Sequence, residues 1–391
     1  MSDLLLPAFD FTPRTRLVFG TGTLSRVGLL AGELGATRAL LVTDRGIVAA
    51  GHAGRTEDAL RQAGIEVTVF DGVRENPTTV DVDHCLTLAR GSGIDLIVGL
   101  GGGSSMDTAK GTNFLVTNGG AMRDYWGVGK ATRPMLPMIA IPTTSGTGSE
   151  CQSAALIADE VTHQKMACLD PKAAARIALL DPELTLSQPP RVTAVTGVDA
   201  LAHALETAVT RKRNPLSSLH SHEAFRLLIG SLPVVLAEPG NLTGRSRMLL
   251  GAALAGTAIE LSMLGAAHAA ANPLTARFNV VHGAAVGLML PAVIRFNAGL
   301  PEIAEIYARL AVDAGIAGTH LHTAAAVDAL VETVIRVLKQ AGISAGLEEA
   351  GVDPALIPTL AGEAAQQWTA GFNPRPIAAA DFEQLYRATP R

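Results

Sequence analysis

The first half of the chain alternates apolar runs with amphipathic helical stretches, and this alternation ends near residue 185. The runs end in polar or glycine turns, as buried strands do; they lie at 39–44, 66–70, 95–103, 135–144 and 177–185. The stretches 53–65 and 79–93 read as helices. Apolar strands separated by helices are typical of a parallel sheet that is covered on both faces.

The second half differs in composition and in the periodicity of its apolar residues. After the sequence SQPP at 187–190, Ala, Leu and helical periodicity dominate, and no stretch reads as a convincing strand. The expected helices include 197–210, 216–236, 245–271, 283–297 and 324–341. We therefore predict an α/β domain over 1–186 and an all-helical domain over 187–391. A cleft between two domains is a usual place for a ligand.

Composition excludes several classes of protein. Of the 391 residues, 48% are apolar and 17% charged, which excludes a disordered chain. The net charge is −5 and like charges do not form blocks, so the charge pattern does not indicate binding to nucleic acid or to a membrane surface. The three cysteines show no CxxC pattern, and the N-terminus does not read as a secretory signal. The apolar stretch 251–276 contains Glu260, His268 and Pro273, so a buried helix is favoured over a membrane span. We expect a cytoplasmic protein without nucleic-acid or membrane partners.

A glycine-rich loop follows the apolar run at 95–103 and opens a helix. Gly101, Gly102 and Gly103 allow a phosphate to approach the backbone, and Ser104 offers a hydroxyl. The following helix adds free N–H groups and a positive dipole end. The loop matches neither GxGxxG nor a Walker A motif, since Lys110 comes too late. It predicts a pyrophosphate cradle; a tight strand-to-helix turn is the alternative.

Two further segments are candidates for cofactor contact. Asp44 ends an apolar run, where a carboxylate commonly holds ribose hydroxyls, although it precedes the glycine loop rather than following it. A helix N-cap explains Asp44 equally well. The segment 141–150 offers Thr143, Thr144 and Thr147, which could bond phosphate, ribose or a nicotinamide amide; a simple connector is the alternative.

Four polar residues stand out in the apolar second half. Asp199 and His203 are four apart on an expected helix and so lie on one face. His268 and His282 sit among small apolar residues, and we expect Pro273 to stop the intervening helix so that the chain folds back and the two rings converge. One carboxylate and three imidazoles suit Fe(II) or Zn(II). Four separately satisfied core residues are the alternative.

The motifs together resemble the iron-dependent (group III) alcohol dehydrogenase family. The resemblance runs from about residue 14 to the C-terminus and rests on VFGTGTL, VTDRGI, ENPT, GLGGGSSMDTAK, IPTTSGTGSE, LLDPELT, GVDALAHALE, NPLSSLHSHEAFRL, VHGAAVGLMLP and FNPRP. It implies an N-terminal α/β dinucleotide-binding domain and a C-terminal all-α domain, the dehydroquinate synthase-like fold. The implied activity is metal-dependent hydride transfer between a nicotinamide cofactor and a small alcohol, aldehyde or ketone.

The resemblance also assigns residues to roles. The implied metal ligands are Asp199, His203, His268 and His282, holding Fe(II), with Zn(II) as the alternative. The implied NAD contacts are Gly101, Gly102, Gly103, Ser104, Asp107, Thr143, Thr147 and Lys165. Asp44, Thr144 and Leu184 complete the set of residues that we predict to bind the cofactor. NAD is expected over NADP because a 2′-phosphate would meet the charge of Asp44. A homodimer or higher homo-oligomer is expected.

One departure from the family concerns catalysis. Many members read HxxxHP after the third ligand, where the second His is tied to proton relay, whereas this chain reads HAAANP with Asn272 in that place. Asn272 either alters the relay or merely caps a helix before Pro273. A reductase of the maleylacetate reductase type or the glycerol dehydrogenase type is the alternative for the function. A dehydroquinate-synthase-like lyase is disfavoured because the metal segments lack Lys and Arg clusters, and a non-enzymatic nucleotide-binding protein is the remaining option.

Overall fold

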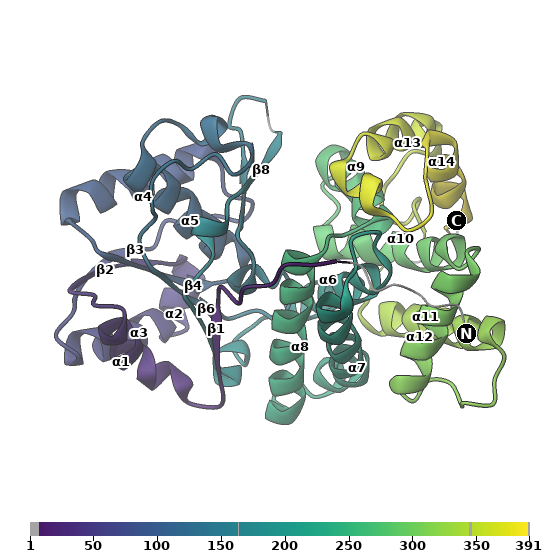
Figure 1. The fold of residues 1–391 in the computed structure, drawn as a ribbon, viewed down its shortest axis with the longest axis horizontal. Coiled ribbons are helices and arrows are strands. Elements are labelled where there is room, and N and C mark those ends of the chain that lie inside the picture. Colours follow the sequence, from purple (N-terminus) through teal and green to yellow (C-terminus); the bar gives the residue numbers. More distant parts are fainter. Residues whose placement is uncertain (1–7, 163, 344–345, 390–391) are drawn as a thin grey trace. The chain divides into compact units, whose positions relative to one another are not determined.

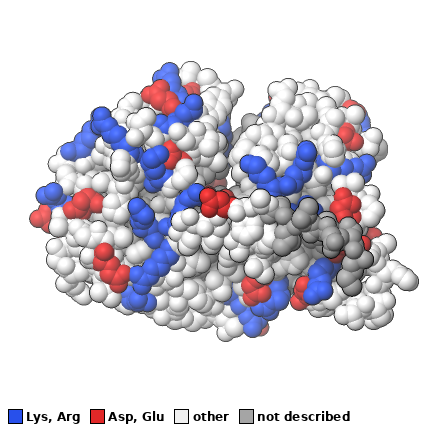
Figure 2. All heavy atoms as spheres, in the orientation of Figure 1, with Lys and Arg blue, Asp and Glu red and all other residues white. Residues whose placement is uncertain are grey.

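The structure, a computed structural model, describes residues 8–162, 164–343 and 346–389. These residues divide into two compact units, one formed by those within 12–188 and the other by those within 189–389 together with 8–11 (Figure 1). The sequence placed this boundary two residues earlier and assigned the N-terminal segment to the first domain. On the face drawn in Figure 2, basic and acidic side chains are interspersed, in keeping with the small net charge.

The first unit is built on a six-stranded parallel sheet in the order β1-β9-β6-β4-β2-β3. Its strands are β1 (Arg16–Phe19), β2 (Arg38–Val42), β3 (Glu66–Phe70), β4 (Leu96–Gly101), β6 (Met138–Pro142) and β9 (Ile177–Leu180). Four of the five runs contain one of these strands in full, and β2 begins one residue before the run at 39–44, which confirms the predicted parallel sheet. The edge strand β1 was not predicted, since three of its four residues are exposed.

Helices cover both faces of this sheet. They are α1 (Val27–Glu33), α2 (Arg45–Ala49), α3 (His52–Gln62), α4 (Thr79–Ser92) and α5 (Gly103–Asn118). Leu41 belongs to a core that includes residues of α1 and α3, whereas its neighbours Leu40 and Val42 belong to a core that includes residues of α4 and α5. Successive side chains of a strand point to opposite faces, so a strand buried on both faces must be apolar throughout.

A small three-stranded sheet in the first unit was not predicted. It has the order β5-β8-β7 and comprises β5 (Gly127–Val128), β7 (Ala154–Ala158) and β8 (Lys165–Leu169). β7 and β8 pair antiparallel, and Ala155, Ile157, Met166 and Cys168 bury their side chains in a separate core. This alternation of buried and partly exposed residues is the period of a strand with one covered face.

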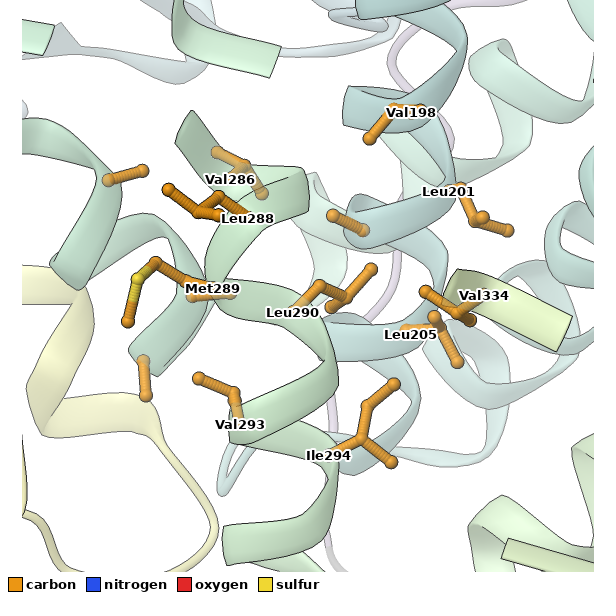
Figure 3. Packing of buried hydrophobic residues seen from close by; sticks show 14 of the residues in the cluster. Val198, Leu201, Leu205, Val286, Leu288, Met289, Leu290, Val293, Ile294 and Val334 are labelled. Atoms are coloured by element: carbon orange, nitrogen blue, oxygen red, sulfur yellow. The ribbon is translucent and has the colours of Figure 1, made fainter. Parts of the chain in front are cut away.

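The described residues of the second unit form helices and connecting loops, with no strand among them. Its helices are α6 (Pro190–Val209), α7 (Pro215–Ala237), α8 (Leu242–Leu261), α9 (Ala266–Phe278), α10 (His282–Asn297), α11 (Pro301–Asp313), α12 (Thr323–Gln340), α13 (Ile357–Ala365) and α14 (Ala379–Ala388). Apolar side chains of α6, α10 and α12 pack together in one extended core (Figure 3). Among the described residues no single helix has the length and apolarity needed to cross a membrane, and the pair α8 and α9, bent by 104°, meets that test by length and composition only.

The prediction of one helix over 245–271 that ends at Pro273 is wrong. α8 ends at Leu261, α9 starts at Ala266, and Pro273 lies inside α9. The break falls at residues 262–265, where Ser262 and Gly265 leave helical geometry. The chain still folds back before His282, but it does so at 279–281, since Asn279 ends α9 in a left-handed conformation with a φ of 54°.

Candidate functional site

One face of α6 carries three buried polar residues at helical spacing. Asp199, His203 and Glu206 follow one another by four and three positions, which places them on one side of the helix. Their exposed fractions are 5%, 5% and 3%. Leu201 and Leu205 of the same helix belong to the apolar core shown in Figure 3.

Two further histidines converge on this face from neighbouring helices. His268 lies in the first turn of α9, and His282 is the first residue of α10. The Nε2 atoms of His203, His268 and His282 lie 3.5, 3.4 and 3.9 Å from the Oδ1 atom of Asp199. The ring centroids of His203 and His268 are 4.9 Å apart, and those of His268 and His282 are 5.4 Å apart. We call these four residues the Asp199 cluster.

The Asp199 cluster has the donors and the spacing of a metal site. One ligand atom each of Asp199, His268 and His282 lies within 4.8 Å of the others, a grouping found once among the described residues. His203 stands outside that strict grouping but keeps its contact with Asp199. Asp199 Oδ1 and His268 Nε2 are buried, and within the described chain neither makes a hydrogen bond of normal geometry. A divalent cation would satisfy both, so these residues fit an Fe(II) or Zn(II) ion.

The charged groups of the Asp199 cluster shift one another's pKa values. Burial alone would raise the pKa of Asp199, but the imidazoles of His203, His268 and His282 hold it well below its usual range. Burial would lower the pKa of His268, but the carboxylates of Glu206 and Asp199 outweigh it and raise that pKa to about 9. The site thus favours positive charge beside Asp199, and protons compete with a cation for it.

Glu206 is a site residue that the sequence analysis missed. Its Oε2 atom contacts Nδ1 of His268 in a short hydrogen bond, and its Oε1 atom accepts a hydrogen bond from the backbone N–H of Ala267 at 2.7 Å. The available signal was the spacing of Asp199, His203 and Glu206, because a buried polar stripe on an apolar helix needs partners.

Asn272 lies one turn beyond His268 in α9 and is half-buried. Its side-chain amide donates a hydrogen bond to Oε1 of Gln367 at 3.0 Å. The alternative that Asn272 caps a helix before Pro273 is wrong, because the residue occupies the interior of α9.

The glycine loop, residues 101–104, joins β4 to α5 in the first unit. Gly101 has a φ of +143°, and a Cβ atom there would collide with Ser105. α5 starts after Gly102, which has no side chain to cap the first N–H groups. These groups are the usual partners of a phosphate at a helix N-terminus.

The threonine loop, residues 143–149, lies directly against the glycine loop. The backbone N–H of Thr143 donates to the carbonyl of Gly101 at 3.0 Å. A Cβ atom on Gly102 would lie 3.4 Å from Cγ2 of Thr144. One on Gly103 would lie 2.8 Å from Cγ2 of Thr147, so a side chain there would force Thr147 to move. The structure therefore brings together the two loops that the sequence proposed separately.

The two carboxylate oxygens of Asp44 have different surroundings. Its Oδ1 atom accepts a hydrogen bond from the backbone N–H of Ile47 at 3.0 Å, so it is the N-cap of α2. Its Oδ2 atom lies 3.5 Å from the position of a Cβ atom on Gly101. The cap is present, and the second oxygen still faces the glycine loop.

Behind the loops lies a buried polar network. Asp107 accepts a hydrogen bond from Ser149 Oγ at 3.0 Å, and Lys110 donates to Ser149 Oγ at 2.9 Å and to its carbonyl at 2.6 Å. Burial raises the pKa of Asp107 although the charges of Lys110 and Lys165 oppose this. The network ties α5 to the threonine loop.

Two predicted cofactor residues differ in their surroundings. Lys165, the first residue of β8, is exposed. Leu184 has an exposed fraction of 0% and packs in the core of the sheet, and its backbone N–H donates to the carbonyl of Asp181 at 3.1 Å.

Comparison with known proteins gives consistent matches along the chain. The family described as "Iron-containing alcohol dehydrogenase" matches residues 13–182, and the description "Fe-containing alcohol dehydrogenase family, C-terminal" matches residues 193–389. The chain is 32% identical to an NAD-dependent methanol dehydrogenase of Bacillus methanolicus over 370 residues, which cover 95% of this chain and 97% of that protein.

Solved structures agree with these matches. A 1,3-propanediol oxidoreductase superposes with a TM-score of 0.94 at 33% identity, covering 98% of this chain and all of that one. A sulfoacetaldehyde reductase from Bifidobacterium kashiwanohense in complex with NAD+ superposes with a TM-score of 0.88 at 28% identity, covering 98% and 99% of the two chains.

Proposed function

Because the chain belongs to the iron-containing alcohol dehydrogenase family and is therefore a metal-dependent oxidoreductase, we propose that it interconverts a small alcohol and its aldehyde or ketone with NAD(H). The Asp199 cluster holds the divalent cation in this proposal, and the glycine and threonine loops hold the cofactor. The observation that carries it is the approach of three imidazole Nε2 atoms to one carboxylate oxygen at 3.4–3.9 Å.

Different residues of the chain have different roles in the proposed reaction. A cation bound by the Asp199 cluster supplies Lewis acidity toward the substrate oxygen, and the nicotinamide supplies or accepts the hydride. Backbone N–H groups at the start of α5 hold the pyrophosphate, and glycines there leave room for it. Asp44 accepts hydrogen bonds from the adenosine ribose hydroxyls through the oxygen that faces Gly101.

The family does not name the alcohol. The relatives reported above act, by their names, on methanol, 1,3-propanediol and sulfoacetaldehyde, which share only a small carbon skeleton with a terminal alcohol or aldehyde. We propose a substrate of this size, and a chain that works as a cytoplasmic homo-oligomer without nucleic-acid or membrane partners.

A panel of short aldehydes tests the proposal. The purified protein is loaded with Fe(II) or Zn(II), and oxidation of NADH is followed at 340 nm with each aldehyde. We expect NADH to be consumed in proportion to the alcohol that forms, and chelation to abolish this. A protein that binds NAD without net reduction of any carbonyl would contradict the proposal and favour a lyase or a binding protein.

A further inference from the structure

Glu206 holds the segment that carries His268 at two adjacent points. Its Oε1 atom accepts from the backbone N–H of Ala267 at 2.7 Å, and its Oε2 atom contacts the His268 ring at Nδ1. Gly265, at the start of α9, provides no side-chain cap, and a Cβ atom there would lie 3.2 Å from Glu206 Oε1. One carboxylate therefore satisfies an N–H group of the first helical turn and also orients the ring.

We propose that Glu206 is a positioning residue that fixes His268 in the tautomer required for metal binding. The inference rests on the proposed role of His268 as a ligand. An ionised carboxylate only accepts hydrogen bonds, so the Nδ1 atom beside it carries the hydrogen. The lone pair of the neutral ring is then on Nε2, which lies 3.4 Å from Oδ1 of Asp199.

An amide at position 206 would reverse this arrangement. In Glu206→Gln the carbonyl oxygen is needed by the N–H of Ala267, so the NH2 group faces Nδ1 of His268. Nδ1 must then accept, and the ring hydrogen moves to Nε2, where it blocks a cation. If the amide flips instead, its NH2 group meets the N–H of Ala267, and two donors face each other in a buried site.

A purely structural role predicts a different result. If Glu206 only satisfied the first turn of α9, the carbonyl of Gln would do the same, and metal binding would be unchanged. Tyr386→Phe is the matched control, because the buried Tyr386 hydroxyl donates to the carbonyl of Ala270 at 2.6 Å in the same helix without a contact to the His268 ring.

The experiment measures Zn²⁺ affinity of the full-length, metal-free protein by competition with a chromogenic chelator at pH 7.5, and the visible absorption of the Co²⁺ form. Folding of each variant is checked by circular dichroism. We expect Glu206→Gln to weaken Zn²⁺ binding about 10- to 100-fold and to change the Co²⁺ spectrum. Tyr386→Phe should bind Zn²⁺ within twofold of the wild type.

Wild-type affinity in a folded Glu206→Gln variant would overturn the proposal. Should that variant not fold, Glu206→Asp replaces it, since a side chain one methylene shorter cannot reach both Ala267 N–H and Nδ1; unchanged Zn²⁺ affinity would again overturn the proposal, and a drop of fivefold or more would support it. His268→Ala is measured alongside. If it too binds Zn²⁺ like the wild type, the proposed metal site itself has failed, rather than the role of Glu206.

Discussion

The side-chain amide of Asn272 donates a hydrogen bond to Oε1 of Gln367 at 3.0 Å, although the two residues are 95 positions apart. This bond anchors the side chain of Asn272 one turn beyond His268 in α9. An amide neither gains nor loses charge near neutral pH. Where the family resemblance implies a histidine, this chain therefore has a hydrogen-bonding group of fixed charge.

Asn272→His should introduce a titrating group at this position. A histidine here can hydrogen-bond to Gln367 and changes charge near pH ~6.5 when unperturbed. We expect a new or displaced inflection between about pH 6 and 8 in kcat/KM for alcohol oxidation, with metal content unchanged. A profile that overlays the wild type from about pH 5 to 10, with the metal retained, would leave Asn272 with a structural role only.

His268→Ala should remove most of the bound metal. The substitution deletes one of the three imidazoles around Asp199 and leaves its buried carboxylate with fewer cationic partners. Metal analysis after gel filtration should give about one divalent ion per wild-type chain and much less than one in the variant. Full stoichiometry with unchanged activity in His268→Ala would refute the ligand assignment.

Gly103→Ala should weaken cofactor binding. The new methyl group would lie 2.8 Å from Cγ2 of Thr147 and would push the two loops apart. We expect the Kd for NADH to rise about tenfold or more, equivalent to about 1.4 kcal/mol. Thr147→Ser in the same chain, which removes the obstructing methyl group, should restore part of the affinity. Gly91→Ala is the control, because a Cβ atom there has no heavy atom within 4 Å, and it should leave the Kd unchanged.

Asp44→Asn should shift the cofactor preference toward NADP(H). The amide oxygen can keep the cap on Ile47, while the negative charge that repels a 2′-phosphate is lost. We expect the ratio of kcat/KM for NADP+ over NAD+ to rise at least about tenfold. Asp44→Gly loses the charge and the cap together, so a similar ratio in both variants would assign the effect to charge. A wild type that prefers NADP+, or an unchanged NADP+/NAD+ ratio of kcat/KM in both variants, would show that Asp44 does not distinguish the two cofactors at the ribose.

Glu150→Gln should stabilise the protein progressively as pH rises above about 4.5, with the full effect above about pH 7. Burial raises the pKa of Glu150 to about 7, and its Oε1 atom has no hydrogen-bond partner in the described structure. Because the folded-state pKa lies above the unfolded value, the carboxyl stabilises the fold most below about pH 4.5 and loses this contribution as pH rises through about 7. The loss is on the order of 3 kcal/mol.

Thermal unfolding across pH measures this effect. The Tm of Glu150→Gln should exceed that of the wild type by several degrees at pH 8 and approach it near about pH 4, where the carboxyl is largely protonated in both the folded and the unfolded state. A difference in Tm that is constant across pH, or largest at pH 5, would contradict an ionisation cost at Glu150.

The sequence by itself determined the elements whose signal is local. A strand buried on both faces must be apolar along its whole length, which is why the run at 95–103 predicts β4, whose six residues are all buried. Asp199 and His203 share a face because four positions make about one helical turn. The glycines at 101–103 mark a strand-to-helix turn because glycine adopts backbone conformations that other residues avoid. The architecture of an α/β domain followed by an all-helical domain was therefore predicted correctly.

Only the tertiary structure decided which distant residues meet. Glu206 contacts His268 across 62 positions, and Asn272 contacts Gln367 across 95. No local periodicity encodes these pairs, because they depend on how α6, α9 and the segment after α13 pack. The break between α8 and α9 was missed for a related reason: a proline is a strong local signal, but Pro273 is accommodated within α9, and the backbone turns instead at Ser262 and Gly265. Packing of whole helices outweighs the preference of a single residue.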